Sequence, residues 1–335
     1  PIFFATSYFL PGVQANGIAA AAQNAWGMAP AVTASIVVIG LGFIIFGGVK
    51  RIARFAEFVV PFMALAYMLI ALVIMLLNLE AVPVMFRLIF ESAFGMHAGF
   101  GAMLGLAVEW GVRRGIYSNE AGQGTGPHHA AAAEVSHPSK QGLVQAFSVY
   151  VDTLVVCSAT AFMILSTGMY NVVGRAGNML YEALPGVEVG PGFAQNAVES
   201  VMPGWGAGFV ALALFFFAFT TIVAYYYMAE TNLVYLLGKL KNPVFLTIGT
   251  RALQVLILIA VAIGVMNDNP SDAWALGDIG VGLMAWLNIV AILILQKPAM
   301  LALRDYERQK KLGVDPVFDP EALGIRNAHF WKKQA

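Results

Sequence analysis

The sequence predicts an all-α integral membrane protein, and three observations support this fold class. Of 335 residues, 59% are hydrophobic and only 11% are charged, whereas soluble domains are about 25% charged. The apolar residues gather in segments long enough to cross a bilayer, which takes about 20 residues. These segments do not alternate apolar with polar residues, and they exceed the roughly 10 residues of a barrel strand. Helices are therefore the predicted spanning elements.

Seven segments are predicted to be membrane-spanning helices from their length and apolar content. In chain order they are Ala31–Val49, Phe58–Leu79, Ala98–Ile116, Leu143–Gly168, Gly208–Leu237, Val244–Met266 and Trp274–Leu295. An eighth, weaker candidate is Phe3–Trp26, which is broken by Pro11 and contains Gln14 and Asn16. Its other residues are mostly small or apolar, so it remains a candidate helix.

The distribution of Lys and Arg predicts the orientation of the spans, because cytoplasmic loops are enriched in both. If the loop after Val49 is placed inside and successive loops then lie on alternating sides of the membrane, Arg87 and Arg175 are the only basic loop residues that fall outside. The residues predicted inside are Lys50, Arg51, Arg54, Arg113, Arg114, Lys140, Lys239, Lys241, Lys297, Arg304, Arg308, Lys310, Lys311, Arg326, Lys332 and Lys333. We therefore expect a transmembrane domain over residues 1–298 and a cytoplasmic tail over residues 299–335.

Glu109 lies near the middle of its predicted span, where ionisable residues are rare and usually functional. Gly105 and Gly111 flank it, so the helix could unwind there and free backbone groups for a ligand. A second candidate for such a break is Gly122–Gly126, where Pro127 would suit the first turn of a new half-helix. The alternative is a glycine-packed helix in which Glu109 pairs with an arginine and an ordinary loop follows.

Two further polar pairs fall within predicted spans. Asp152 and Thr153 could supply oxygen ligands or a gate, or could tie two helices together by a hydrogen bond. Thr220 and Thr221 could offer hydroxyl oxygens to a cation, or could bond back to their own helix. Tyr225 lies one turn from Thr221 on the same helix face.

Enzyme and nucleic-acid functions receive little support from the residues. His128 and His129 point to different sides of a helix, and with His137 they match no metalloprotease spacing. The glycines at Gly122–Gly126 lack the lysine and the preceding strand of a phosphate-binding loop. Acidic and basic residues number 19 each, so net charge attracts no nucleic acid. We predict no enzymatic activity.

Four stretches of sequence resemble the alanine or glycine:cation symporter family. The most specific is "GVRRGIYSNEAGQGTGPHHAAAAEVSHPSKQG", followed by "FSVYVDTLVVCSATAFMIL". The other three are "VQANGIA", "GGVKRIARFAEFVVPFMALAYML" and "LRDYERQKKLGVDPVFDP". The similarity covers essentially the whole chain.

This resemblance implies a sodium-coupled amino-acid carrier with the leucine-transporter fold of two inverted five-helix repeats. Phe3–Trp26 then resembles the third core helix, Ala98–Ile116 the broken sixth, and Trp274–Leu295 the tenth. The chain is expected to hold core helices three to ten only, so its transporter domain is expected to be N-terminally incomplete. Because the family's first core helix contributes to the sodium and substrate sites, a non-transporting fragment is one alternative.

The resemblance also implies roles for individual residues. Tyr225 stands where members of the family can have tryptophan, which leaves the size of the pocket open. The residues expected at the substrate are Gln14, Asn16, Glu109, Tyr117, Thr221 and Tyr225. Sodium is expected at Thr220 and Thr221, and coupling or gating at Asp152 and Thr153.

The function expected from these observations is sodium-coupled symport of alanine or glycine by alternating access, in a bacterial inner membrane with the C-terminus in the cytoplasm. The expected partners are the amino acid, sodium as the coupling ion and the lipid bilayer, with no other cofactor. A membrane channel is the alternative from another class. An intramembrane enzyme would need a nucleophile and base, or a metal cluster, at one depth, and the sequence offers neither.

Overall fold

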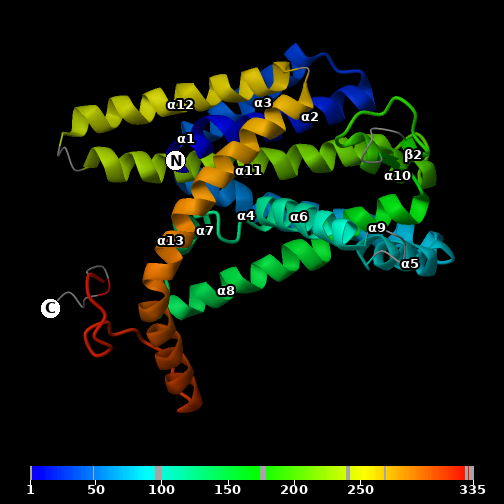
Figure 1. Cartoon of the computed structure of the whole chain (residues 1–335). Coiled ribbons are helices and arrows are strands. Elements are labelled where there is room, and N and C mark those ends of the chain that lie inside the picture. Colours follow the sequence, from blue (N-terminus) through cyan, green and yellow to red (C-terminus); the bar gives the residue numbers. More distant parts are fainter. Residues whose placement is uncertain are drawn as a thin grey trace.

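The computed structural model describes residues 2–47, 49–94, 100–173, 179–238, 242–267, 269–328 and Trp331, without the side chains of residues 49–56, 100–107 and Pro270. Within these ranges the chain forms a helical bundle with a short β-hairpin (Figure 1). The helices are α1 (Ile2–Phe4), α2 (Leu10–Trp26), α3 (Pro30–Ile45), α4 (Val49–Leu77), α5 (Ala81–Phe94), α6 (Phe100–Asn119), α7 (Gly126–Ala132), α8 (Pro138–Tyr150), α9 (Ser158–Thr167), α10 (Gly192–Val201), α11 (Gly206–Gly238), α12 (Pro243–Met266) and α13 (Pro270–Lys311). Two π-helical segments are η1 (Ala5–Phe9) and η2 (Val151–Cys157), and the strands are β1 (Asn171–Val173) and β2 (Met179–Glu182).

The helical character of every predicted span is confirmed within the described residues. The weak first candidate is one continuous helix made of α1, η1 and α2, so the expectation that Pro11 breaks it is wrong. Pro11 is the second residue of α2, two positions after the end of η1. The wider π-helical turn has already changed the hydrogen-bond register there, which allows a residue without an N–H group.

Five helical segments of the described residues are long and apolar enough to cross a membrane. They are Glu57–Leu77, Pro138–Thr167, Gly206–Gly238, Pro243–Met266 and Ser271–Lys311. The apolar helix α3 is shorter, with 16 residues. Long apolar helices agree with a multi-pass membrane protein.

The main core lies between α2, α3, α11 and α12, which run side by side in Figure 1. Its buried residues are mostly small or β-branched, as close helix packing requires. Gly12 and Gly264 make the tightest approach, because a Cβ atom on Gly264 would overlap the backbone of Gly12. The core consists of Ala15, Ile18, Ala19, Val37, Leu41, Ile44, Ile45, Ala218, Phe219, Ile222, Val223, Tyr226, Ala229, Leu253, Ile257, Val261 and Val265.

A second core joins α4, α9, α10 and α11. The Tyr67 and Thr160 hydroxyls hydrogen-bond within it at 2.8 Å. The polar segment between α9 and α11 carries α10 and the antiparallel hairpin of β1 and β2, in which Val172 pairs with Tyr181. The sequence analysis predicted no membrane-spanning helix in this segment.

Large apolar side chains cover much of the outer surface. The exposed fractions of Phe58, Trp286 and Ile39 are 80%, 74% and 72%. A water-soluble protein rarely exposes apolar surface so continuously. These side chains are suited to contact with lipid.

α13 is far longer than a span requires. Its 42 residues continue through Pro298 to Lys311, which gives a length of about 63 Å at 1.5 Å per residue. A bilayer core is about 30 Å thick. The domain boundary predicted at residue 298 therefore falls inside a continuous helix, whose second half extends away from the bundle beside α8 (Figure 1).

The segment after α13 returns to the loop between α7 and α8, and we call these contacts the tail clamp. The Lys140 ammonium donates to the Asp315 carboxylate at 2.6 Å. The Ser136 hydroxyl donates to the Pro316 carbonyl at 2.8 Å, and the Phe318 N–H donates to the Ser136 carbonyl at 3.0 Å. The end of α13 is thereby fixed to the loop that follows α7.

A buried histidine lies under the tail clamp. His137 is fully buried, with its Nε2 atom 3.5 Å from a carboxylate oxygen of Asp305. Burial lowers the pKa of His137, although the Asp305 carboxylate acts in the opposite direction. Burial also raises the pKa of Asp305, but hydrogen bonds from Arg308 and Gln309 outweigh it and hold that pKa below its usual value.

Some residues used to predict orientation cannot be placed. Arg175, Lys239, Lys241, Lys332 and Lys333 lie outside the described residues, as do the side chains of Lys50, Arg51 and Arg54. The orientation therefore stays a prediction.

Candidate functional site

The chain leaves the helical conformation between α6 and α7. α6 ends at Asn119 and α7 begins at Gly126. Glu120, Gly122 and Gly124 between them have positive φ angles of 57°, 82° and 97°. A left-handed backbone costs glycine little but is unfavourable for glutamate. The second of the two predicted break positions is therefore confirmed.

Glu109 lies in a continuous part of α6, so the predicted unwinding around it is wrong. A single glycine costs a helix only about 1 kcal/mol, and Gly105 and Gly111 are tolerated in the middle of α6. The Glu109 side chain is 53% exposed and accepts a hydrogen bond from Arg113 at 2.8 Å. The alternative ion-pair interpretation is thus confirmed, and a role in substrate binding stays a prediction.

Side chains satisfy the backbone groups that the break leaves free. The Gln123 amide donates to the Ile116 carbonyl at 2.5 Å. The Asn119 side chain accepts from the Ala121 N–H at 2.9 Å. Asn288 of α13 donates to the Gly122 carbonyl at 2.9 Å. Such partners are necessary because backbone groups that are buried without a hydrogen bond are costly.

A polar group that we call the central cluster surrounds the break. It consists of Gln14 from α2, Tyr117 from α6, Glu120 and Thr125 from the break, and Tyr225 from α11. Gln14 faces the side chains of both tyrosines, and the Glu120 carboxylate faces Thr125 and Tyr225. Thr125 is fully buried and Tyr225 is 3% exposed. Three residues predicted at the substrate therefore meet, although they come from distant parts of the chain.

The sequence analysis missed Glu120 and Thr125 as members of this cluster. The alternating glycines at positions 122, 124 and 126 were the available signal, since a left-handed turn can aim a preceding side chain back into the bundle.

An ion pair borders the central cluster. Arg114 donates two hydrogen bonds to Asp278 of α13, at 2.6 and 2.8 Å. The Arg114 guanidinium also lies 5.5 Å from the centre of the Tyr117 ring and 4.9 Å from that of Trp274. This ion pair neutralises the Arg114 guanidinium, which lies over the Tyr117 ring, and it joins α6 to α13.

The predicted pair Asp152 and Thr153 contacts the last turn of α6. The Ser118 hydroxyl donates to Asp152 at 2.8 Å, and the Asn119 amide donates to Thr153 at 3.0 Å. Both acceptors lie in η2, and π-helical turns occur frequently at functional sites. These hydrogen bonds join α6 to η2, as the helix-tying interpretation predicted. The gating role stays a prediction.

Thr220 and Thr221 bond back to their own helix. The Thr220 hydroxyl donates to the Phe216 carbonyl at 2.9 Å, and that of Thr221 donates to the Phe217 carbonyl at 2.9 Å. A hydroxyl that donates to a carbonyl keeps lone pairs that can face a cation. These hydrogen bonds within α11 therefore do not prevent the two hydroxyls from binding sodium, and the sodium role stays a prediction.

Asn16 does not join the central cluster. Its amide donates to the carbonyls of Gly264 and Asn267, at 3.3 and 2.8 Å. It is buried against the end of α12, where it borders a cavity of about 630 Å³ that also contacts the segment before α10.

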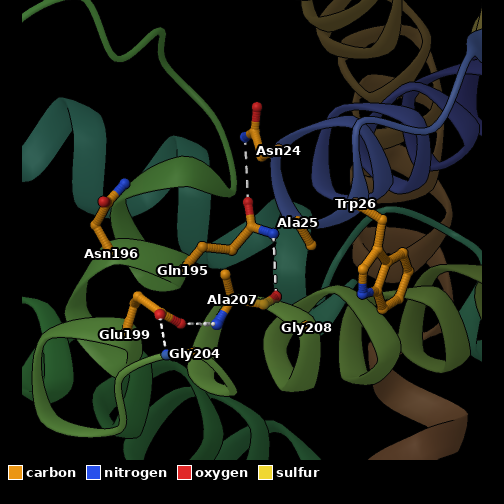
Figure 2. A pocket seen from close by; sticks show the side chains of 9 residues that line it. All are labelled: Asn24, Ala25, Trp26, Gln195, Asn196, Glu199, Gly204, Ala207 and Gly208. Carbon is orange, nitrogen blue, oxygen red and sulfur yellow. Dashed lines mark hydrogen bonds between the residues drawn. The ribbon is translucent and has the colours of Figure 1, made fainter.

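A neighbouring cavity of about 440 Å³ lies between the end of α2, one side of α10 and the start of α11 (Figure 2). Gln195 crosses it, accepting from Asn24 at 3.1 Å and donating to the Ala207 carbonyl at 3.2 Å. Glu199 accepts from the Ala207 N–H at 2.8 Å. These bonds tie α10 to the end of α2 and the start of α11, away from the central cluster.

The histidines have individual partners. His128 lies 2.8 Å from the Asn232 amide, and His129 stacks on Tyr227 with ring centres 6.1 Å apart. In the described part of the chain, no three His, Cys, Asp or Glu side chains are placed to hold a metal ion together.

Comparison with known proteins identifies relatives along nearly the whole chain. Residues 1–320 match the sodium:alanine symporter family. YrbD of Bacillus subtilis (strain 168) is 60% identical over 98% of this chain and 67% of its own length. The sodium/proton-dependent alanine carrier protein of Bacillus sp. (strain PS3) is 54% identical over 99% of this chain and 74% of its own length. The sodium/alanine symporter AgcS of Methanococcus maripaludis is 34% identical over 84% of this chain and 58% of its own length.

Proposed function

Because the chain belongs to the sodium:alanine symporter family, we propose that it couples the transport of alanine, or of glycine, to sodium. The family consists of symporters rather than enzymes. Relatives at 54% and 34% identity are named for alanine and for sodium. Five long apolar helices support a multi-pass membrane location.

The observation that carries this proposal is the break between α6 and α7 with the central cluster around it. A broken helix exposes polar groups at membrane depth without opening a continuous water-filled pore. Gln14, Tyr117 and Tyr225 would line the substrate pathway beside the break. Thr221 lies one turn before Tyr225 on α11, so its hydroxyl would hold sodium next to the substrate.

The proposed mechanism is alternating access in a leucine-transporter-like fold with inverted repeats. One helix group would rock against another around the break. Sodium would drive transport by binding one conformation more tightly than the other. Asp152 and Thr153 would couple this motion to the last turn of α6 through Ser118 and Asn119. The C-terminal arm of α13 would lie in the cytoplasm of a bacterial cell.

The test is alanine uptake into proteoliposomes as a function of sodium concentration. Loss of one neutral ligand is worth about 1 kcal/mol, so Thr221→Ala should raise the half-saturating sodium concentration about fivefold. Thr221→Ser should have a smaller effect. The matched control is Thr231→Ala, because Thr231 on the same helix makes the same back-bond, to the Tyr227 carbonyl at 2.8 Å.

Uptake that ignores the sodium gradient would contradict the proposed symport. Ion currents far above carrier turnover would instead favour the channel. An equal sodium shift for Thr221→Ala and Thr231→Ala would contradict the sodium site and leave the transport function standing.

A further inference from the structure

α13 contacts the chain on both sides of the break between α6 and α7. Before the break, its Asp278 accepts two hydrogen bonds from Arg114 of α6, at 2.6 and 2.8 Å. At the break, its Asn288 donates to the Gly122 carbonyl at 2.9 Å. After the break, the tail clamp joins the end of α13 to the loop that follows α7. A movement of α7 away from α13 would therefore pull directly on the clamp.

The tail that forms one side of the clamp belongs structurally to α13. The Gln309 amide donates to the Val317 carbonyl at 2.9 Å, and the Val317 N–H donates to the Gln309 side-chain oxygen at 3.0 Å. The loop after α7 reaches the tail through the neutral hydrogen bonds of Ser136 and through an ion pair whose Asp315 side chain is 72% exposed. Exposed ion pairs contribute little to stability. The junction between the loop and the tail is therefore where the clamp can separate.

A cluster of aromatic rings favours the closed clamp. Phe318 of the tail is 8% exposed, and its ring meets that of His137 edge-on with the centres 5.2 Å apart. The His137 ring also lies 5.4 Å from the ring of Tyr306 on α13. These rings pack together only while the loop lies against the tail. Opening the clamp would expose buried apolar surface, which is unfavourable.

The surroundings of α11 differ between its two ends. The cavity of about 440 Å³ adjoins Gly208 at the start of α11, whereas the His128 ring of α7 lies 2.8 Å from the Asn232 amide near its end. Between Gly208 and Asn232 the helix is about 36 Å long, at 1.5 Å per residue. At the clamp end, His137 and Phe318 are buried. The structure is therefore hollow at the end remote from the clamp and packed at the clamp end.

We propose that the tail clamp is a latch that keeps the clamp end of the transport path closed, and that it opens once in each transport cycle. The inference rests on the proposed function, because alternating access requires one end of the path to close while the other is open. On opening, the loop after α7 leaves the tail, while the tail remains on α13. Because the clamp stabilises only one of the two conformations, its strength determines their populations.

The first test fixes the clamp covalently. The Ser136 hydroxyl lies 3.5 Å from the Asp315 carboxylate, so Ser136→Cys and Asp315→Cys can be joined by a short bifunctional thiosulfonate reagent. Cys157→Ala removes the only native cysteine. In proteoliposomes, the cross-link should lower alanine uptake at least about tenfold and change alanine binding less than about twofold, because it blocks a conformational step and not the substrate site. Dithiothreitol, which cleaves the cross-link, should restore uptake.

The matched control joins the tail to its own helix. The pair Gln309→Cys and Val317→Cys takes the same reagent and leaves the loop after α7 free, so its cross-link should not change uptake. Full uptake by the cross-linked pair at Ser136 and Asp315 would overturn the latch, as would equal inhibition by the two cross-links. Loss of alanine binding together with uptake would also overturn it, because the clamp would then be needed for structure alone.

A second measurement detects the opening without transport. Spin labels at the exposed positions Ala131 on α7 and Glu307 on α13 report the distance between the two sides of the clamp. Without ligands, Phe318→Ala should raise the fraction of longer distances about tenfold, because a buried ring is lost from the closed state alone. Leu312→Ala, at a 73% exposed position of the same segment, should match the wild type. An unchanged distance distribution in Phe318→Ala would overturn the latch.

The two measurements keep the latch apart from the proposed function. Sodium-driven alanine uptake that survives the cross-link between the loop and the tail would refute the latch alone. A wild type that takes up no alanine, but whose label distances lengthen in Phe318→Ala, would refute the transport function and leave the opening of the clamp.

Discussion

Alanine substitutions at three glycines should distinguish the stability cost of a left-handed backbone at the break from the cost of crowding a neighbouring side chain. Gly142 lies in α8, and a Cβ atom added to it would have no neighbouring heavy atom within 4 Å. Gly122 has equal space but a φ of 82°. Gly124 has a φ of 97°, and its Cβ would lie 3.2 Å from Asn288 Cβ and 3.3 Å from Ile2 Cδ1.

The three expected effects differ in sign and size. Gly142→Ala should stabilise the protein by about 0.5–1 kcal/mol, because alanine loses less entropy in a helix. Gly122→Ala should destabilise it by about 1–2 kcal/mol from the left-handed backbone alone. Gly124→Ala adds crowding, so about 2–4 kcal/mol is expected.

Thermal stability in detergent, followed by fluorescence-detected size exclusion, measures the order of the variants. The expected order of melting temperature is Gly142→Ala, wild type, Gly122→Ala and Gly124→Ala. Wild-type stability for Gly124→Ala would show that the turn rearranges freely, and would refute the rigid break. Equal losses for Gly122→Ala and Gly124→Ala would refute the contribution of Asn288.

Asp278→Asn should lower the stability by about 1–2 kcal/mol, since its bidentate bond with Arg114 is only partly exposed to solvent; unchanged melting would contradict this. Because the pKa of His137 is lowered in the folded protein, the neutral ring is favoured, and its contribution is complete above about pH 6.5 and lost as the pH falls below that value. The protection factors of the amides within residues 314–318, which divide out the intrinsic pH dependence of exchange, should therefore fall at pH 5.5, and His137→Gln should remove this response; wild-type protection factors that do not change with pH would contradict it. Glu109→Gln should cost about 0.5 kcal/mol or less, as an exposed helical pair does, and should change the ranking of alanine against glycine in competition uptake. An unchanged ranking would leave Glu109 a structural partner only.

The spanning helices could be predicted because each carries its own signal, a run of about 20 apolar residues. The position of the break was harder to predict, since glycines stand both at 105 and 111 and at 122 and 124. Helical backbone bonds survive around the first pair. Positive φ angles occur at the second pair, Gly122 and Gly124. There the side chains of Asn288 and Gln123 hydrogen-bond to backbone carbonyls that the break leaves free.

The central cluster could be predicted only in part. Family resemblance pointed to Gln14, Tyr117 and Tyr225, but composition and spacing gave no sign that they meet. Glu120 was missed because its inward direction depends on a left-handed φ, which is unusual for a glutamate and which only the neighbouring glycines indicated. The tail clamp was missed because Lys140 and Asp315 are far apart in the chain, and nothing in the sequence indicates that they meet.

The length of α13 has a practical consequence for imaging. A membrane protein of 35.8 kDa offers few features for aligning particles in electron microscopy once a micelle surrounds it. The second half of α13 is a straight attachment point in a fixed relation to the bundle, because the tail clamp holds its end. Arg304 and Glu307 are exposed on it, so an antibody fragment raised against that face would serve as a marker. A fusion that replaced the residues after Lys311 would remove the clamp and with it the rigidity that makes the marker useful.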